Sequence, residues 1–285
     1  GRVLHSLLGI AISEATARRY TQRHGEAYEM VQTAAVIAIE TQLPEPPAGP
    51  TQQLLSVDGA MVPLVHGDWA EVKTMVIGEL GEPLVKEGES VVHSHNLSYF
   101  SRLADAETFA RLALAETQRR GVEQAQLVVA PTDGALWIQG FLDYHRRDAQ
   151  RILDFGHAAE YVAQIGTAVG PSGSPEFSAW LQRSLHTLKH DGVQALLPEL
   201  RAQVTQPPEV PERAEALAYL EKRVTMMDYP TYQRQGWPIG SGSVESANKV
   251  VVEARLKGAG MHWAPAHVNP MLSLRNAVCN DRWAE

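Results

Sequence analysis

The sequence predicts an α/β fold that continues into a region made only of helices. Short runs of apolar, β-forming residues recur between positions 54 and 155. An amphipathic stretch with helical spacing separates the third run from the fourth. From about residue 165 to 235 the pattern becomes helical and polar, with Gly and Pro between the segments. The expected order of the α/β part is three strands, a helix, a strand, a helix and a strand.

The amino-terminal residues 1–42 predict a helical segment. Apolar residues at helical spacing run from Leu4 to Tyr28, with a break near residues 9–12, and Ser13 is placed to cap a second helix. That helix carries Arg18, Arg19, Arg23 and His24. The pattern fits a remnant of a helix-turn-helix DNA-binding region and fits a peripheral helical pair equally well. The Pro-rich residues 43–52 then predict a linker, and residues 53–285 a single larger domain.

The strands and helices of the larger domain follow in order from local patterns. Strands are expected at Leu54–Gly59, Val72–Gly78, Ser90–His95, Gln126–Ala130 and Arg151–Phe155. Helices are expected at Asp105–Arg120 with Asp105 as its cap, through Trp137 and Phe141, and at His157–Gln164. The helical region should contain Phe177–His190, Val193–Gln203 and Glu212–Met227. Two more helices are expected, one from near Ser243 and one through Met271–Val278.

Composition and charge limit the classes of protein that the chain can represent. The 285 residues are 44% hydrophobic, which is enough for a substantial core. No stretch approaches the roughly 18 to 20 consecutive apolar residues of a membrane helix, and no signal peptide is evident, so we expect a cytoplasmic protein without membrane partners. The single Cys279 excludes an intramolecular disulfide framework and a multi-cysteine zinc site. The start at Gly1-Arg2-Val3 rather than Met suggests a truncated chain.

The formal net charge of −8 argues by itself against a nucleic-acid partner, because Lys and Arg supply most non-specific DNA affinity. Local basic patches can coexist with a negative total, however. A site where carboxylates hold metal also adds acidic residues where phosphate is handled. The net charge therefore does not decide whether the protein binds nucleic acid.

Two predicted strands lead directly into Asp-Gly, at Asp58 and Asp133. If these strands are neighbours that end together, the two carboxylates lie close at one edge of the sheet and repel each other unless a cation bridges them. Mg²⁺ suits such a place because it prefers oxygen ligands and keeps positions for water and phosphate. Either Asp-Gly pair alone is more typical of an ordinary turn.

A third acidic residue follows a glycine-serine loop. Residues 240–249 read Gly-Ser-Gly-Ser-Val-Glu-Ser-Ala-Asn-Lys, so that Glu245 falls in the first turn of the predicted helix, with Ser243 as a plausible cap. The glycine-rich entry leaves backbone N–H groups available to an anion. A flexible connector is the alternative interpretation of this loop.

Together these motifs resemble the DDE transposases of bacterial insertion sequences, in the Mutator-like group and its Kra-type branch. The matching pieces, which span most of the chain, are residues 57–60, 132–138, 152–160 and 238–246. The resemblance implies an RNase H-like mixed sheet with flanking helices. It also implies a helical insertion at about 165–235, before the catalytic glutamate, and this explains the 245 − 133 = 112 residues between the last two acids.

The resemblance implies that Asp58, Asp133 and Glu245 are the catalytic residues and the metal ligands. They would hold two Mg²⁺ ions, for which Mn²⁺ can substitute, and catalyse phosphodiester hydrolysis and strand transfer at the ends of an insertion sequence. The implied partners are DNA and further copies of the chain assembled on it. The rival interpretations are a domesticated or inactive RNase H-like DNA-binding protein and a metal-dependent nuclease without strand transfer.

Asp154 competes with Asp133 for the second acidic position, since it too lies at the end of a predicted strand. Its spacing to His157 matches the Asp/Cys-x-x-His signature that accompanies the catalytic acids in the Mutator-like group. We therefore assign Asp133 to the metal and treat Asp154 and His157 as supporting residues. The candidates for DNA contact are Lys249, Arg255, Lys257 and Trp263, whose alternatives are solvated charge and core packing.

Overall fold

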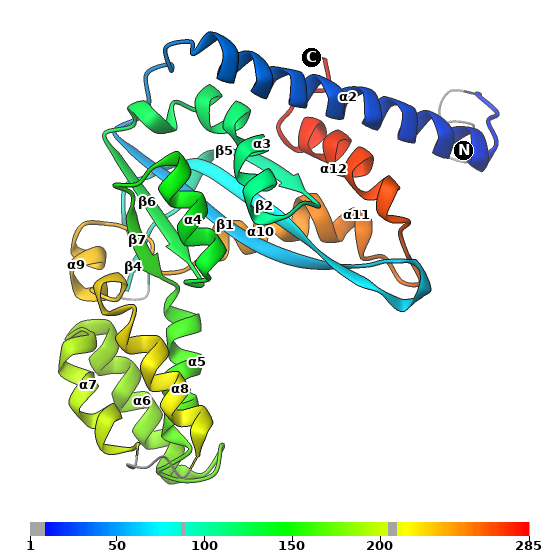
Figure 1. The fold of residues 1–285 in the computed structure, drawn as a ribbon. Coiled ribbons are helices and arrows are strands. Elements are labelled where there is room, and N and C mark those ends of the chain that lie inside the picture. Colours follow the sequence, from blue (N-terminus) through cyan, green and yellow to red (C-terminus); the bar gives the residue numbers. More distant parts are fainter. Residues whose placement is uncertain (1–8, 87–88, 205–209, 285) are drawn as a thin grey trace.

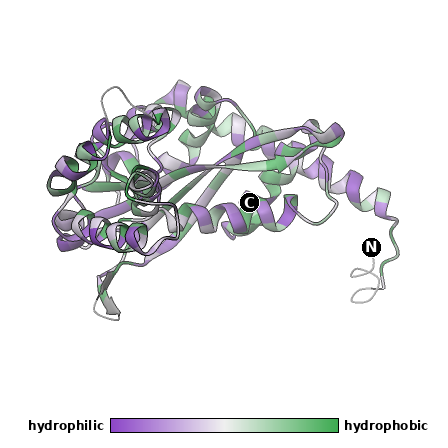
Figure 2. Ribbon diagram, turned by 90° about the horizontal axis from the view of Figure 1, so that it is seen from below, coloured by the Kyte–Doolittle hydropathy of each residue, from purple (hydrophilic) through white to green (hydrophobic). Residues whose placement is uncertain are grey.

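The computed structural model describes residues 9–86, 89–204 and 210–284. It shows a mixed α/β protein in which helices flank a five-stranded sheet (Figure 1). A group of helices extends away from one end of that sheet (Figure 1). In Figure 2 most helices show hydrophilic and hydrophobic residues side by side, as expected for elements with one buried face.

The sheet has the order β5-β2-β1-β6-β7. Its strands are β1 (Gln52–Pro63), β2 (Trp69–Leu80), β5 (Ser94–Arg102), β6 (Leu127–Thr132) and β7 (Gln150–Leu153). β1 pairs antiparallel with β2, and β2 with β5, whereas β1 with β6 and β6 with β7 are parallel. A separate two-stranded ladder joins β3 (Leu84–Lys86) and β4 (Glu89–Val91). The predicted order of strands and helices is thereby confirmed within the main sheet.

The helices are distributed over both faces and one end of the sheet. They are α2 (Glu14–Gln42), α3 (Ala106–Arg119), α4 (Leu136–His145), α5 (Phe155–Gly166), α6 (Pro175–His190), α7 (Val193–Ala202), α8 (Pro211–Glu221), α9 (Tyr229–Arg234), α10 (Gly242–Ala247), α11 (Ala254–Leu256) and α12 (Pro265–Cys279). A π-helical segment, Asn248–Glu253, joins α10 to α11. The helices expected between 165 and 235 are confirmed, although α8 ends at Glu221 rather than at Met227.

Alternation along β1 divides the core between the two faces of the sheet. Leu55 and Val57 are buried together with α3 and α4 side chains. Leu54 packs with α10, and Ala60 and Val62 pack with the π-helical segment and α12. Successive strand residues point to opposite faces, so Asp58 belongs with the second set and faces the α10 side.

The helices α5 to α9, here called the helical group, share a core of their own. It includes Val162, Trp180, Leu196 and Leu220, and it reaches the end of the sheet at Ile152 and Leu153 of β7. The group is therefore joined to the sheet by packing as well as by the chain.

The structure corrects two predicted strands. β1 does not end at Asp58, because its antiparallel pairing with β2 continues as far as Pro63 opposite Trp69, which leaves Asp58 in mid-strand opposite Thr74. The strand expected at 90–95 is divided between β4 and the start of β5, and most of β5 lies beyond it. Serine and histidine in that stretch obscured the alternating pattern.

The amino-terminal region contains one long described helix. The Ser13 side chain accepts a hydrogen bond from the Thr16 N–H, which confirms Ser13 as the cap of α2. The helix continues past Tyr28 to Gln42 and packs against α12 and α3. The helix expected before the break falls on residues 1–8, outside the described residues. Residues 43–50 form neither helix nor strand.

Candidate active site

The predicted acidic residues line one open cavity of about 360 Å³. Its walls come from β1, from the segments that follow β6 and β7, and from α5 and α10. The lining residues are Val57, Asp58, Asp133, Asp154, Gly156, His157, Glu160, Ser241, Val244 and Glu245. Asp58, Asp133, Glu245, Asp154 and His157, all predicted from the sequence, are therefore brought together.

Sheet register explains why three of these acids meet. Leu54 of β1 pairs with Val129 of parallel β6; Asp58 lies four residues after Leu54 within β1, and Asp133 lies four residues after Val129, just beyond the end of β6. Thr132 pairs with Leu153 at the ends of β6 and β7, so that Asp133 and Asp154 leave the sheet side by side. The carboxyl ends of parallel strands meet at one sheet edge, a usual place for ligand sites in α/β proteins.

Asp58 is the acid most affected by its surroundings. Burial, and after it the negative charges of Asp133 and Glu245, raise its pKa from 3.8 to about 6. Two hydrogen bonds oppose the rise: the Gly59 N–H donates to Oδ1 at 2.7 Å, and Asn248 Nδ2 donates to Oδ2 at 2.9 Å. A cation that offsets the negative charges of the neighbouring carboxylates would therefore stabilise the ionised form of Asp58.

Asp133 lies in a tight turn directly after β6, as predicted. Its Oδ1 accepts a hydrogen bond from the Ala135 N–H at 2.8 Å, and the Gly134 N–H donates to Thr132 Oγ1 at 2.7 Å. Gly134 has a φ of +79°, which a residue with a side chain rarely adopts. The Tyr219 hydroxyl, from the helical group, donates to the Asp133 carbonyl oxygen.

Asp154 has a different role in the same cavity. Its Oδ1 accepts from the His157 N–H at 2.6 Å and caps α5, and its Oδ2 accepts from the Ser241 N–H at 2.6 Å. Both carboxylate oxygens thus serve backbone groups, and they connect the start of α5 to the glycine-serine loop. This use of Asp154 favours Asp133 as the second metal ligand.

His157 lies beside Asp154 without contacting a predicted ligand. Its Nδ1 is 3.6 Å from a Glu160 carboxylate oxygen, and its ring lies edge-on to Tyr161 at 5.3 Å between centroids. These contacts are those of a supporting residue.

Glu245 lies in the first turn of α10, as predicted, and is exposed to the cavity. The residue that precedes the helix as its cap is Ser241, not Ser243, which is already helical because the turn begins at Gly242. The Ser241 hydroxyl donates to Glu245 Oε1 at 3.1 Å. The glycine-serine loop therefore contacts two acids, Asp154 through its backbone and Glu245 through its side chain.

Asn248 is a functional candidate that the sequence reasoning missed. It is 5% exposed, and while its Nδ2 holds Asp58, its Oδ1 is buried without a hydrogen-bond partner. It begins the π-helical segment, a distortion that often marks functional sites. Asn248 follows Glu245 by three residues, so that both lie on one helix face. This spacing is the sequence feature from which Asn248 could have been predicted.

The carboxylates that line this cavity suit a hard divalent cation, which prefers oxygen ligands. The raised pKa of Asp58 and the partnerless Asn248 oxygen are further observations that fit such an ion. As the side chains stand, no three His, Cys, Asp or Glu residues of the described part of the chain are arranged so that they could hold a metal ion. Binding would require the carboxylates to move closer together.

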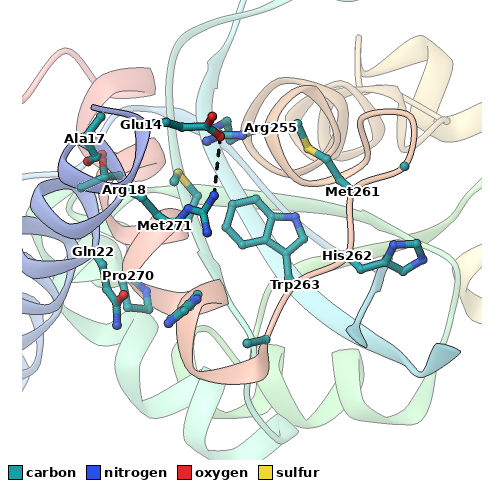
Figure 3. A pocket seen from close by; sticks show the side chains of 14 residues that line it. Glu14, Ala17, Arg18, Gln22, Arg255, Met261, His262, Trp263, Pro270 and Met271 are labelled. Carbon is teal, nitrogen blue, oxygen red and sulfur yellow. Dashed lines mark hydrogen bonds and ion pairs between the residues drawn. The ribbon is translucent and has the colours of Figure 1, made fainter. Parts of the chain in front are cut away.

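The predicted DNA-contacting residues lie elsewhere. Arg255 and Trp263 line a second, larger cavity of about 630 Å³ between α2 and the loop before α12 (Figure 3). The Arg255 guanidinium carbon is 5.4 Å from the centre of the Trp263 ring. Lys257 pairs with Glu253 at 2.8 Å, and Lys249 is exposed on the π-helical segment. Only Arg255 and Trp263 of the four are brought together.

Two hydrogen bonds position Trp263 in this second cavity. Its indole N–H donates to the Leu256 carbonyl oxygen at 3.1 Å, and its backbone N–H donates to Pro63 at the end of β1. Across the cavity, Arg18 of α2 lies 3.5 Å from Glu14, the pair joined by a dashed line in Figure 3. The cavity therefore offers an ordered aromatic ring beside cationic groups.

Comparison of the chain with models of known protein families finds no match, and comparison with characterised proteins finds no similar sequence. Among the described helices, none combines the length and the hydrophobicity needed to cross a bilayer. A proposal about function therefore rests on the geometry of the site and on the sequence motifs that line it.

Proposed function

We propose that the protein is a metal-dependent DNA phosphoryl-transferase of the DDE transposase type, built on an RNase H-like fold. One observation carries this: Asp58, Asp133 and Glu245, the catalytic set that the resemblance implies, line the same cavity although 187 residues separate the first from the last (245 − 58). The resemblance of the surrounding motifs to DDE transposases supports the same conclusion.

The topology supports the fold assignment. The mixed sheet, with three antiparallel strands followed by two parallel strands in the order β5-β2-β1-β6-β7, is compatible with the RNase H-like sheet that the resemblance implies. The first acid belongs to the first strand and the second follows the fourth strand of this sheet. The third belongs to a helix that comes after the helical group.

Each acid has a distinct part in the proposed mechanism. Asp58, with its raised pKa between two other carboxylates, would be shared by the two ions, and Asp133 and Glu245 would each hold one of them. Two bound divalent ions would activate the attacking oxygen and stabilise the leaving oxygen of a phosphodiester. Gly59 and Asn248 fix the direction of the Asp58 carboxylate through their hydrogen bonds. Asp154 positions the glycine-serine loop beside Glu245.

DNA is the proposed substrate, contacted in part at the second cavity. Arg255 and Arg18 can approach phosphate, and the rigid Trp263 ring can stack on a base. Because the net charge of −8 opposes DNA binding by the chain as a whole, we expect the affinity for DNA to come from local groups of cationic side chains such as this one. Assembly of several copies on DNA belongs to the same proposal.

The test is divalent-ion-dependent cleavage of DNA by the purified chain. With Mg²⁺ or Mn²⁺ we expect the protein to nick supercoiled plasmid, and D58N, D133N and E245Q to lose about three orders of magnitude or more in rate. The matched control is Glu160→Gln, which changes an exposed carboxylate in the same cavity that the mechanism does not use. Full activity in the Asp58→Asn protein would defeat the proposal.

The same assay separates the rival functions. A DNA-binding protein without activity should shift the mobility of duplex DNA with or without metal and cut nothing. A nuclease without strand transfer should nick DNA but fail to join a labelled 3′-hydroxyl end to the plasmid. Joined products are the result expected of a transposase.

A further inference from the structure

Two side chains of the helical group reach the turn that carries Asp133. Tyr219 lies in the last turn of α8, and Arg223 follows four residues later, just beyond the end of the helix. The Tyr219 hydroxyl donates to the Asp133 carbonyl oxygen. Arg223 donates to the Gly134 carbonyl oxygen from Nε at 3.1 Å and from Nη2 at 2.8 Å. Three hydrogen bonds thus hold two successive carbonyl groups of this turn.

The two side chains are themselves held in place. The Arg223 guanidinium carbon lies 3.5 Å from the centre of the Tyr219 ring, and its Nη1 donates to the Tyr219 carbonyl oxygen. The other face of Tyr219 stacks on Tyr161 of α5, with ring centres 3.9 Å apart and planes 12° from parallel. Tyr219 is therefore fixed between a cation and a second ring, which leaves its hydroxyl little freedom.

Gly134 fits closely against this pair of side chains. A Cβ atom at this position would lie 2.5 Å from Arg223 Nε and 2.8 Å from the Tyr219 hydroxyl oxygen. Neither distance is compatible with an ordinary contact, so the backbone of the turn lies directly on the two side chains. A displacement of α8 must then displace the turn.

Asp133 needs such support more than Asp58 does. Asp58 lies within β1 and is paired across the sheet with Thr74, whereas β6 ends at Thr132 and Asp133 has no strand partner. Within the turn, the Thr132 hydroxyl and the Asp133 carboxylate each accept one backbone N–H. The Asp133 and Gly134 carbonyl oxygens, by contrast, accept hydrogen bonds from side chains of the helical group.

We propose that Tyr219 and Arg223 are positioning residues, which set the direction of the Asp133 carboxylate toward a divalent cation. The helical group thereby governs the metal affinity of a site to which it contributes no predicted ligand. This inference rests on the proposed function, in which Asp133 is a metal ligand.

The experiment compares Tyr219→Phe and Arg223→Lys with the wild-type chain. Hydrogen exchange of the segment spanning residues 130–137 is measured without metal, and Mn²⁺ binding is measured by calorimetry. The matched control is Tyr232→Phe, which removes a hydroxyl-to-carbonyl hydrogen bond of the same kind, to Thr225, within the helical group. Arg223→Lys keeps the positive charge but loses the paired donation to Gly134, and it serves as a second variant if loss of the Tyr219 hydroxyl weakens the fold.

We expect faster exchange in the 130–137 segment in both variants, and Mn²⁺ affinity reduced by about 10- to 100-fold, as for other residues that orient metal ligands. The Tyr232→Phe control should keep wild-type values of both. Unchanged exchange, or unchanged Mn²⁺ affinity while Asp58→Asn abolishes binding, overturns the inference and leaves the proposed function standing. Absence of Asp58-dependent Mn²⁺ binding in the wild-type chain overturns the proposed function, and the inference with it.

Discussion

Replacing Asp58 by Asn should stabilise the metal-free protein at neutral pH. Burial and two neighbouring carboxylates raise the Asp58 pKa from 3.8 to about 6, a difference of about 2.2 pH units. At about 1.36 kcal/mol per unit, keeping this group ionised in the folded chain costs about 3 kcal/mol. Asn is neutral and avoids that cost.

Part of the gain is lost again in hydrogen bonding. Asp58 accepts two hydrogen bonds, from Gly59 and Asn248, whereas the Asn amide has one acceptor oxygen, so that about 1 kcal/mol is lost. The net stabilisation is then about 2 kcal/mol. With an unfolding entropy of about 2.1 cal/mol/K per residue over 285 residues, this raises the Tm by about 3 °C.

The effect should depend on pH in a defined direction. The folded chain binds the Asp58 proton more tightly than the unfolded chain does, so the contribution of Asp58 to wild-type stability falls as the pH rises from about 4 to about 6 and is then level. The advantage of Asp58→Asn is therefore absent near pH 4 and complete above pH 6. Saturating Mg²⁺ should reverse the order of the two Tm values, because it stabilises only the chain that binds it, by about 2.7 kcal/mol at one hundred times its Kd.

The assay is thermal unfolding between pH 4 and 8, with and without Mg²⁺. Asp68→Asn is the control, since it makes the same chemical change at an exposed carboxylate outside the cavity. The electrostatic reasoning is refuted if Asp58→Asn melts at or below the wild-type temperature at pH 7 without metal, or if both chains gain equally from Mg²⁺.

Three further predictions concern the surroundings of the site. Asp154→Asn should cost about 1–3 kcal/mol, measured by urea unfolding, because the neutral amide offers one acceptor oxygen to two part-buried backbone N–H groups. An unchanged midpoint contradicts this role. Gly134→Ala should lower the free energy of unfolding by about 2 kcal/mol or more in the same assay, because Gly134 has a positive φ and lies against the Arg223 side chain. A loss below about 0.5 kcal/mol, which is on the order of a surface substitution, would contradict the close packing of Gly134 on Arg223. Trp263→Ala should weaken single-stranded DNA binding by about 1–3 kcal/mol and leave unchanged the slope of log binding constant against log salt concentration, whereas Arg255→Gln should reduce this slope by about one. Fluorescence anisotropy at several salt concentrations distinguishes the two variants. Equal slopes for Arg255→Gln and the wild-type chain would exclude a phosphate contact by Arg255.

The sequence by itself determined the order of the elements and which acidic residues we propose as the catalytic set. Apolar runs and Gly or Pro breaks are local signals, so the position of β6 before Asp133, the cap at Asp105 and the helices after residue 165 could all be predicted. The three acids could be grouped because their motifs, taken together and in this order, resemble those of one family. No local signal showed that β1 continues past Asp58, since that depends on its pairing with β2.

Only the tertiary structure decided which groups each acid contacts. Asp133 and Asp154 look alike in sequence, both at the end of a strand, but Asp154 is committed to two backbone N–H groups, one of them 87 residues away at Ser241. Asn248 and Tyr219 acquired their roles in the same way, through contacts with Asp58 and Asp133 across 190 and 86 residues. Hydrogen bonds and charge repulsion act over a few ångströms in space, and the sequence does not record which distant residues the fold brings within that range.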